Sequence, residues 1–583
     1  MSRIRVATLS ELRERGVIVV SGADRPIAVF AHDDRVSAVD NRCPHIGFPL
    51  HTGTLKEGLL TCHWHEARFD ICNGCTFDLW ADDVASFATV IEEGTVFVDD
   101  RPRRQPDESY YRRRLSHGLE HGISLIQAKA ILGLRRNQTD WSEIVREIAL
   151  FGSRRHDNWD QGMTILAVVG NLIPHLGEQT TYHALFRASR QVAINCSNAV
   201  SHRPREPLDD ADHSPERLKQ WMSHWVQCRH RDGAERVLLT AIERFGSSQE
   251  LTGLVYSAAL DRVYSQTGHV FDFTNKAFEL LDLVGWEHAG EILPLLLDRM
   301  VTARGAEEDA HWHHPIELVE PLREVENELG DLLNEGRNKT WIATNDVLDV
   351  LLGDDPQQII DGLAGWLRLG ATPAELARRV AYAAALRLAR FAMTNEVADW
   401  FGPRHTFIFA NAVHQAVKRC ETAGTVRGIF QAAFSVYMDR FLNHPAARLP
   451  DAAENLDDLP SGADALQQRL LSLLDTQASV TETALTVARY LRLGHPVDGL
   501  IDTLTLATVR EDFDFHAVQV LEAGVRQYFE WDGKPEGEHI LIGVVRQLAA
   551  FCPTPRAGHQ TATIASRLER GDKIYEEADY QPQ

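Results

Sequence analysis

Residues 41–70, NRCPHIGFPLHTGTLKEGLLTCHWHEARFD, decide the fold of the N-terminal part of the chain. The stretch holds a Cys-x-His pair, Cys43 and His45, and a Cys-x-x-His pair, Cys62 and His65. Two thiolates on one iron and two imidazoles on the other are the ligand set of a mixed [2Fe–2S] cluster. The same four donors also suit a tetrahedral zinc ion, so the spacing alone leaves both kinds of site open.

The sequence around these four residues favours the iron–sulfur cluster. From about Val17 to Val98 the chain resembles bacterial Rieske ferredoxins and the Rieske domains of oxygenases. The resemblance is carried by the two ligand pairs and by the residues that flank them, namely Pro44, Gly47, Pro49, Leu50, Gly53, Phe69 and Asp70. It implies a small antiparallel β-domain that holds a [2Fe–2S] cluster at its tip through the two Cys and two His residues and transfers single electrons.

Two departures from the family pattern indicate a low-potential, soluble type of Rieske domain. His63 stands where proline usually follows the second cysteine, and we expect it at the surface or beside the cluster rather than as a ligand. High-potential respiratory members have a disulfide between the two ligand loops, but the corresponding positions here are Phe48 and Ala67. Cys72 and Cys75 follow the second loop, and we expect two free thiols, with redox or metal chemistry as the alternative.

Hydrophobic patterning predicts a β-rich domain at the beginning of the chain. Short β-branched or alternating segments predict strands over 17–20, 27–31, 35–40 and 84–98. Within the last of these segments, Glu93-Gly94 is typical of a hairpin turn. We therefore expect an all-β Rieske domain over residues 1–103.

The sequence changes character after this domain. The stretch RPRRQPDESYYRRR has two prolines and no periodicity, which predicts a linker over 104–116. From residue 117 to residue 583 the chain is almost entirely amphipathic helix, with apolar residues at three-and-four spacing. Recurring patterns predict a large all-α domain of degenerate helical-hairpin repeats, divided into halves at 117–345 and 346–583.

The helical part is rich in histidine, which suggests a second metal site. Four segments that we expect to be helices begin with a histidine after a loop, and these are His183, His269, His405 and His516. Repeated hairpins would bring these positions to one face, and a helix N-terminus favours the neutral, ligating imidazole. Further candidates in the following loops are His313, His314 and His444. We expect members of this set to hold a non-haem iron, with a haem or a purely structural role in capping and packing as alternatives.

Composition and motifs narrow the class of function. The net charge of −23 argues against binding to nucleic acid or to an anionic membrane, and no apolar run approaches the roughly 20 residues of a membrane span. Because the sequence has no Gly-rich nucleotide motif after a strand, we expect electrons from a separate reductase or ferredoxin. The acidic residue and His-x4-His of ring-hydroxylating α-subunits do not occur after residue 104. We expect a cytoplasmic protein.

We therefore predict an iron-dependent oxidoreductase of the oxygenase kind, in which the cluster passes electrons to a histidine-bound iron that acts on a small-molecule substrate. The alternative is a Rieske electron carrier or redox sensor tethered to a helical scaffold that binds a protein partner. The position of the histidines distinguishes the two hypotheses. Convergence at one point beside a pocket favours the enzyme, whereas dispersal through packed helix interfaces favours the scaffold.

Overall fold

The computed structural model describes residues 3–22, 25–209, 213–344, 346–451, 454–477, 479–531 and 533–572. These residues form two compact units, one from the described parts of 1–144 and 557–583 and the other from those of 145–556. Across the described chain, no helix is long and apolar enough to cross a membrane.

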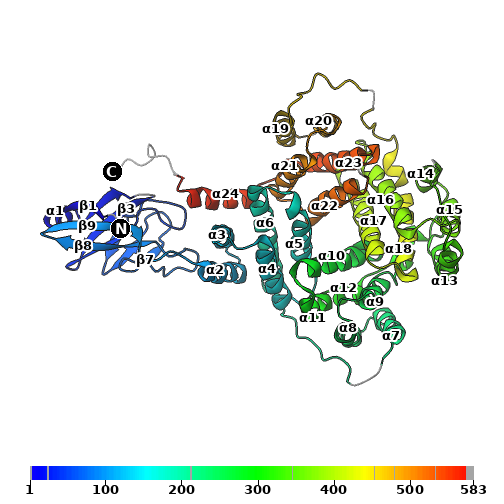
Figure 1. Ribbon diagram of the computed structural model, residues 1–583, viewed down its shortest axis with the longest axis horizontal. Helices are drawn as coiled ribbons and strands as arrows, with labels where there is room; N and C mark the ends of the chain where they lie inside the picture. The colour runs from blue at the N-terminus through cyan, green and yellow to red at the C-terminus, as the bar shows by residue number, and fades with distance from the viewer. Residues whose placement is uncertain are drawn as a thin grey trace. The chain divides into compact units, whose positions relative to one another are not determined.

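The first unit begins with an antiparallel β-fold, as the sequence predicts (Figure 1). Its strands are β1 (Arg3–Thr8), β2 (Val17–Ser21), β3 (Pro26–His32), β4 (Arg35–Asp40), β5 (Thr54–Lys56), β6 (Leu59–Thr61), β7 (Arg68–Asp70), β8 (Ser86–Glu92) and β9 (Thr95–Pro102). Six of them form one sheet in the order β1-β9-β8-β4-β3-β2, and β5-β6-β7 form a second sheet. Glu93 and Gly94 join β8 to β9 with φ values of 48° and 76°, so the predicted hairpin turn is confirmed.

Two ligand loops extend from these sheets over a common apolar core. Residues 41–49 follow β4, and residues 62–67 join β6 to β7. The core beneath them contains Phe30, Leu60 and Phe69, each almost fully buried. Cys43 and Cys62 belong to the same buried cluster, so packing fixes where both loops leave the sheets.

Helices complete the first unit around the β-fold. They are α1 (Leu9–Arg15), α2 (Glu108–Glu120), α3 (Ser124–Arg136) and the distant α24 (Ala557–Arg570). Helices α2 and α3 pack as a hairpin, and α24 packs against α3. The end of the described chain therefore belongs to the same unit as the ligand loops.

Helix α2 occupies most of the segment 104–116, which the sequence marks as a linker. Asp107 caps this helix, because its side chain accepts a hydrogen bond of 2.8 Å from the backbone N–H of Tyr110. Pro106 lies just before the cap, where it does not interrupt the helix, so proline here marks a helix start instead of an extended linker. The domain boundaries expected from the sequence stay predictions.

The rest of the described chain is helical, and the second unit has no strand among its described residues, which confirms the all-α expectation. Helix α4 (Trp141–Arg155) crosses the boundary between the two units. The helices that follow it are α5 (Gln161–Leu172), α6 (Glu178–Cys196), α7 (Pro215–Gln227), α8 (Arg231–Phe245), α9 (Gln249–Ala259), α10 (His269–Val284), α11 (Ala289–Ile292), α12 (Leu297–Thr302), α13 (Val319–Gly336), α14 (Asp346–Leu351), α15 (Pro356–Arg368), α16 (Pro373–Ala389), α17 (Phe401–Arg419), α18 (Ala423–Met438), α19 (Ala463–Leu474), α20 (Val480–Arg492), α21 (Val497–Val509), α22 (Phe515–Glu530) and α23 (Pro535–Phe551). Neighbours in sequence pack as hairpins, such as α5 with α6, α16 with α17 and α22 with α23.

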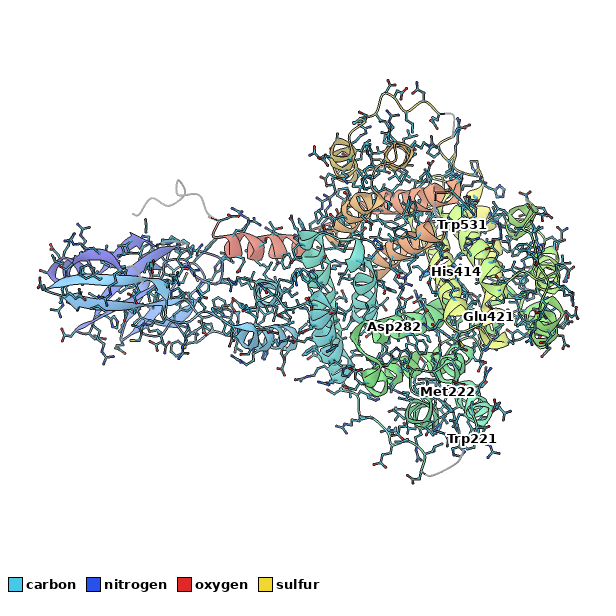
Figure 2. All side chains as sticks on the ribbon, in the orientation of Figure 1. Trp221, Met222, Asp282, His414, Glu421 and Trp531 are labelled. Atoms are coloured by element: carbon cyan, nitrogen blue, oxygen red, sulfur yellow. The ribbon has the colours of Figure 1, made fainter. Side chains whose placement is uncertain are left out.

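In the second unit, α17 packs against both α10 and α22, and α10 contacts α22 through the side chains of Lys276 and Glu522. The three helices are labelled in Figure 1. Near their C-terminal ends, Arg419 of α17 forms an ion pair with Asp282 of α10. His414 of α17 lies 2.9 Å from the side-chain nitrogen of Gln527 in α22. Figure 2 labels Asp282 and His414 on these helices. These contacts hold the C-terminal halves of the three helices together.

A buried ionic network fixes the register of α10 and α22. The Nζ atom of Lys276 donates to Glu279 on its own helix and to Glu522 on α22, both at 2.7 Å. Asn171 of α5 donates to both carboxylates at 2.8 and 3.0 Å. Burial raises the pKa of Glu279, but the Lys276 and Arg526 cations outweigh this effect and lower that pKa to about 2. Glu279 is thus held as an anion.

Removing Glu522 from this network leaves the Lys276 and Arg526 cations to share Glu279 in the core. We expect Glu522→Ala to lower the free energy of unfolding of the helical unit by about 3–5 kcal/mol, because Lys276 then lacks its partner on α22. The matched variant Glu324→Ala, on the exposed face of α13, should change stability by about 0.5 kcal/mol or less. Urea unfolding of the full chain measures both, and equal midpoints for the two variants would contradict the role of the network.

Candidate functional site

The two ligand loops of the β-domain have the same hydrogen-bond pattern. In each, the cysteine N–H donates at 2.8 Å to a carbonyl five residues later, Phe48 for Cys43 and Ala67 for Cys62. In each, the backbone N–H of the residue four positions after the cysteine donates to the cysteine carbonyl. That residue has a positive φ, 85° for Gly47 and 62° for Glu66. The two loops therefore hold their cysteines in equivalent ways, whereas the histidine follows two residues after Cys43 and three residues after Cys62.

The side chains of the loops suit a [2Fe–2S] cluster. Hydrogen bonding between the two thiols lowers the pKa of Cys62 to about 6 and raises the pKa of Cys43, so the sulfurs lie close together. The rings of His45 and His65 are 4.8 Å apart between centroids. The Nδ1 atom of His45 is buried and has no hydrogen-bond partner among the described residues, as expected for an atom that binds a metal. The four residues thus fit the cluster that the ligand pattern implies.

A lysine from the helical extension contacts the first ligand loop. The Nζ atom of Lys129 in α3 donates to the carbonyl of Pro44 and, at 3.2 Å, to that of His45. Its ammonium also lies 3.2 Å from Asp82, which accepts a 2.9 Å hydrogen bond from Arg114 of α2. Burial lowers the pKa of His45 to about 4, and the nearby Lys129 cation adds to this effect. Helix α3 therefore holds the loop and places a positive charge beside it.

The structure also places the other residues singled out near the loops. His63 is exposed, and its Nε2 atom lies 2.6 Å from the hydroxyl of Thr54. Cys72 is half-buried and Cys75 is exposed, and both are free thiols. Trp64 is exposed and its ring lies 4.9 Å from that of His65, so an aromatic surface adjoins the second histidine.

In the second unit, three of the predicted histidines meet at one point. The Nε2 atom of His516 in α22 is 3.0 Å from that of His269 in α10 and 2.9 Å from that of His405 in α17. One nitrogen of each imidazole lies within 4.8 Å of the other two. Metal–nitrogen bonds of about 2.0–2.1 Å bring neighbouring ligand atoms to roughly this separation. These residues are called the histidine triad below.

The contacts of the histidine triad orient its rings toward a common centre. Asp272 accepts a 2.7 Å hydrogen bond from Nδ1 of His269, so the Nε2 atom of that ring faces the other two imidazoles. Burial, followed by the charge of the neighbouring imidazoles, lowers the pKa of His405 to about 2, and burial also lowers the pKa of His516. One N–H on His516 cannot satisfy two facing nitrogens, whereas a cation at the centre satisfies all three.

The segment that enters α10 is held in a strained conformation. Tyr264, Gln266 and Thr267 have φ values of 44°, 49° and 54°, and Gly268 follows at 88°. Such angles are rare outside glycine, above all for β-branched threonine. A Cβ atom on Gly268 would lie 2.8 Å from Phe409, so the close approach to α17 also requires glycine. Backbone strain of this kind clusters at functional sites, and here it positions His269 directly.

The remaining histidines of the predicted set lie apart from the triad. His183 lies within α6, beside the ring of Tyr182, and not at the start of a helix. His313 pairs with Glu317 at 2.6 Å, and His314 and His444 are exposed. The sequence reasoning did not identify Asp272 or Asp514, although the patterns His-x-x-Asp and Asp-x-His place a carboxylate beside two of the triad histidines.

The strand order, the paired ligand loops and their four side chains define a small iron–sulfur electron-transfer domain. A family model described as the Rieske [2Fe-2S] domain matches residues 2–87. A 3-phenylpropionate/cinnamic acid dioxygenase ferredoxin subunit from Photorhabdus laumondii is 30% identical over 100 residues, which cover 17% of this chain and 94% of that protein. Through its N-terminal domain, the chain belongs to the Rieske [2Fe–2S] family.

Further similarities concern the same domain. Human apoptosis-inducing factor 3 is 39% identical over 62 residues, and this chain spans only 10% of its length. The ferredoxin of carbazole 1,9a-dioxygenase from Nocardioides aromaticivorans is 25% identical and is covered completely, with 17% of this chain aligned and a TM-score of 0.17. The similarity to dioxygenase ferredoxins supports a Rieske electron carrier, and a Rieske domain implies a [2Fe–2S] cluster.

The position of Lys129 predicts an effect on the reduction potential. Because reduction adds negative charge to a cluster, we expect Lys129→Gln to lower the potential. Lys56→Gln is the matched control, since this exposed lysine lies at the end of the β5–β6 hairpin opposite Cys62. A redox titration followed by electron paramagnetic resonance (EPR) measures both variants. A potential that is unchanged in Lys129→Gln would contradict the electrostatic role of α3.

Proposed function

We propose that this chain is an iron-dependent oxidoreductase of the oxygenase kind, whose histidine triad holds a non-haem iron and whose Rieske domain supplies it with electrons. When bound, the [2Fe–2S] cluster accepts and donates single electrons. The observation that carries the proposal is the convergence of His269, His405 and His516 on one point from three separate helices.

The choice of iron follows from the donors and from the fused domain. Neutral imidazoles suit iron, copper and zinc alike, so the donors alone do not select the metal. A source of single electrons is useful only to a metal that changes oxidation state, which favours iron over zinc. A haem fits poorly, because nitrogens 2.9–3.0 Å apart leave no space for a porphyrin plane between them.

Within this proposal each triad residue has a separate role. His269 is oriented by Asp272, which stabilises the tautomer with a free Nε2 lone pair. His516 faces both of the other imidazoles, so its position sets the centre of the site. His405 is only half-buried, so the site is accessible on the α17 side.

The partners follow from the class of the Rieske domain. The relatives named as ferredoxin components or subunits belong to dioxygenase systems. By analogy, we propose that a separate reductase or ferredoxin reduces this chain and that a small molecule is the substrate. The strongly acidic composition of the chain, with a net charge of −23, suits weak docking to a donor protein that presents a basic patch. A cytoplasmic location is part of the same proposal.

Metal analysis tests the proposal directly. On anaerobically purified, iron-loaded protein we expect iron in excess of acid-labile sulfide. His516→Ala should remove the excess and leave the Rieske EPR signal intact, because the triad and the ligand loops are separate sets of residues. His311→Ala is the matched control, since the side chain of His311 is 86% exposed.

Equal iron and sulfide in the loaded wild-type protein would instead contradict the proposal. That result favours the Rieske carrier or redox sensor on a helical scaffold. Loss of the Rieske signal in His516→Ala would also count against two independent sites.

A further inference from the structure

Two residues outside the histidine triad join the first turns of α17 and α22. Arg404 immediately precedes His405 on α17, and Asp514 is the N-cap residue of α22, two positions before His516. The Nη2 atom of Arg404 donates to Oδ1 of Asp514 at 2.5 Å. This ion pair therefore links the helix starts that carry two of the three triad histidines.

The guanidinium of Arg404 has a fixed place in the protein interior. The residue is 1% exposed, and its guanidinium lies 5.2 Å from the ring centre of Phe401 and 5.0 Å from that of Phe551. Among the described residues, Asp514 is the one carboxylate that forms an ion pair with it. A buried cation depends strongly on a single anionic partner, because removing that partner leaves the charge uncompensated. Arg404 and Asp514 thus fix each other's position.

The backbone that presents Asp514 is held by an arginine of α6. Arg187 donates to the carbonyl oxygen of Glu511, at 2.9 Å, and to that of Phe513. Both carbonyls belong to the segment directly before α22. The carboxylate of Asp514 then accepts a hydrogen bond of 3.1 Å from the backbone N–H of His516, which caps the helix. The backbone and the side chain of Asp514 are therefore held by separate contacts.

Asp514 also approaches the ring of His516, on the edge opposite to the centre of the triad. The Nδ1 atom of His516 lies 3.4 Å from Oδ1 of Asp514, whereas its Nε2 atom faces the other two imidazoles. This Nδ1 atom is buried and has no other partner among the described residues. The arrangement resembles that of His269, whose Nδ1 atom lies 2.7 Å from Asp272. A carboxylate beside the far nitrogen orients a ligating imidazole.

The orientation of His516 affects the whole triad. Its Nε2 atom lies 3.0 Å from that of His269 and 2.9 Å from that of His405, so a rotation of this one ring changes both distances. Tight binding requires that all three nitrogens reach a metal at about 2.0–2.1 Å. The contacts that hold the ring of His516 should therefore control how tightly the triad binds a metal.

We propose that Asp514 and Arg404 are positioning residues that set the affinity of the histidine triad for its metal. Asp514 holds the ring of His516 with its Nε2 atom at the centre of the triad. Arg404 holds the carboxylate of Asp514 and keeps the start of α22 against the start of α17. This inference rests on the proposed function, because it requires a metal at the triad. It extends the site to two residues that do not bind the metal themselves.

The test measures Co²⁺ binding to the full-length protein with an intact, oxidised cluster. Equilibrium dialysis gives the affinity, and the oxidised [2Fe–2S] cluster has no net electron spin, so it does not obscure the EPR signal of bound Co²⁺. Asp514→Asn is the main variant, because asparagine caps a helix as well as aspartate does but has no charge to pair with Arg404. We expect this variant to bind Co²⁺ about 10- to 100-fold more weakly and to alter its EPR signal at saturation.

Further variants serve as controls. Asp355→Asn is the matched control, since Asp355 caps α15, a helix that carries no triad residue, through the same kind of contact. It should leave the Co²⁺ affinity and the EPR signal unchanged. Arg404→Met should weaken binding, because Asp514 then loses the cation that holds it. Arg404→Lys should retain more affinity than Arg404→Met, because it keeps a positive charge at this position.

A double variant separates positioning from stability. Asp514→Asn combined with Arg404→Met leaves no unpaired charge in the interior, so its stability in urea should exceed that of Asp514→Asn alone. We expect its Co²⁺ affinity to stay low, because His516 still lacks its carboxylate. A double variant that binds Co²⁺ as tightly as the wild-type protein would overturn the inference, since the pair would then act only through stability.

The failure of this inference can be distinguished from that of the proposed function. If the wild-type protein binds no Co²⁺ that His405→Ala loses, both fail. If it binds such Co²⁺ and Asp514→Asn binds it equally well, only the inference fails. An equal loss of affinity in Asp355→Asn would also overturn the inference, because any change at a helix cap would then weaken the site.

Discussion

The buried contact of Lys276 with Glu279 and Glu522 is the constraint on which the helical unit depends. An ammonium between two carboxylates in the core tolerates little displacement, because a shift along either helix separates unlike charges in a medium of low polarity. The contact fixes α10 against α22, and the packing of α17 against both helices fixes the position of α17. His269, His405 and His516 can therefore meet within hydrogen-bond distance although long stretches of sequence separate them.

The Rieske unit shows a related use of a buried cation. Matched backbone hydrogen bonds shape the two ligand loops, and these belong to the β-domain itself. Lys129 comes from α3, beyond the residues 2–87 that match the family model. The helical extension thus contributes a contact to the first ligand loop that the matched domain lacks. In the first unit the cation comes from a helix beyond the matched domain, whereas in the second unit it lies on a helix that carries a triad histidine.

The sequence was sufficient for the features that depend on local pattern. Ligand spacing indicated the Rieske domain, alternation predicted strands β2, β3 and β4, and Glu93-Gly94 predicted a turn. The linker expected over 104–116 stays a prediction, but the absence of a periodic pattern there did not reveal helix α2, whose cap follows Pro106. Tertiary contacts showed which of the seven predicted histidines lie together, namely His269, His405 and His516. His183 was predicted together with His269, but it lies inside α6. The His-x-x-Asp pattern of His269 is absent at His183, where Phe186 stands in place of the aspartate.

The central claim is that electrons held by the Rieske domain leave through the metal of the histidine triad. The most direct measurement reduces the iron-loaded full-length protein anaerobically, mixes it rapidly with dioxygen, and follows reoxidation of the cluster by its absorbance. His405→Ala with a fully assembled cluster is the comparison. The account predicts that the wild-type cluster is reoxidised faster than that of the variant. Equal rates in the two proteins would contradict it.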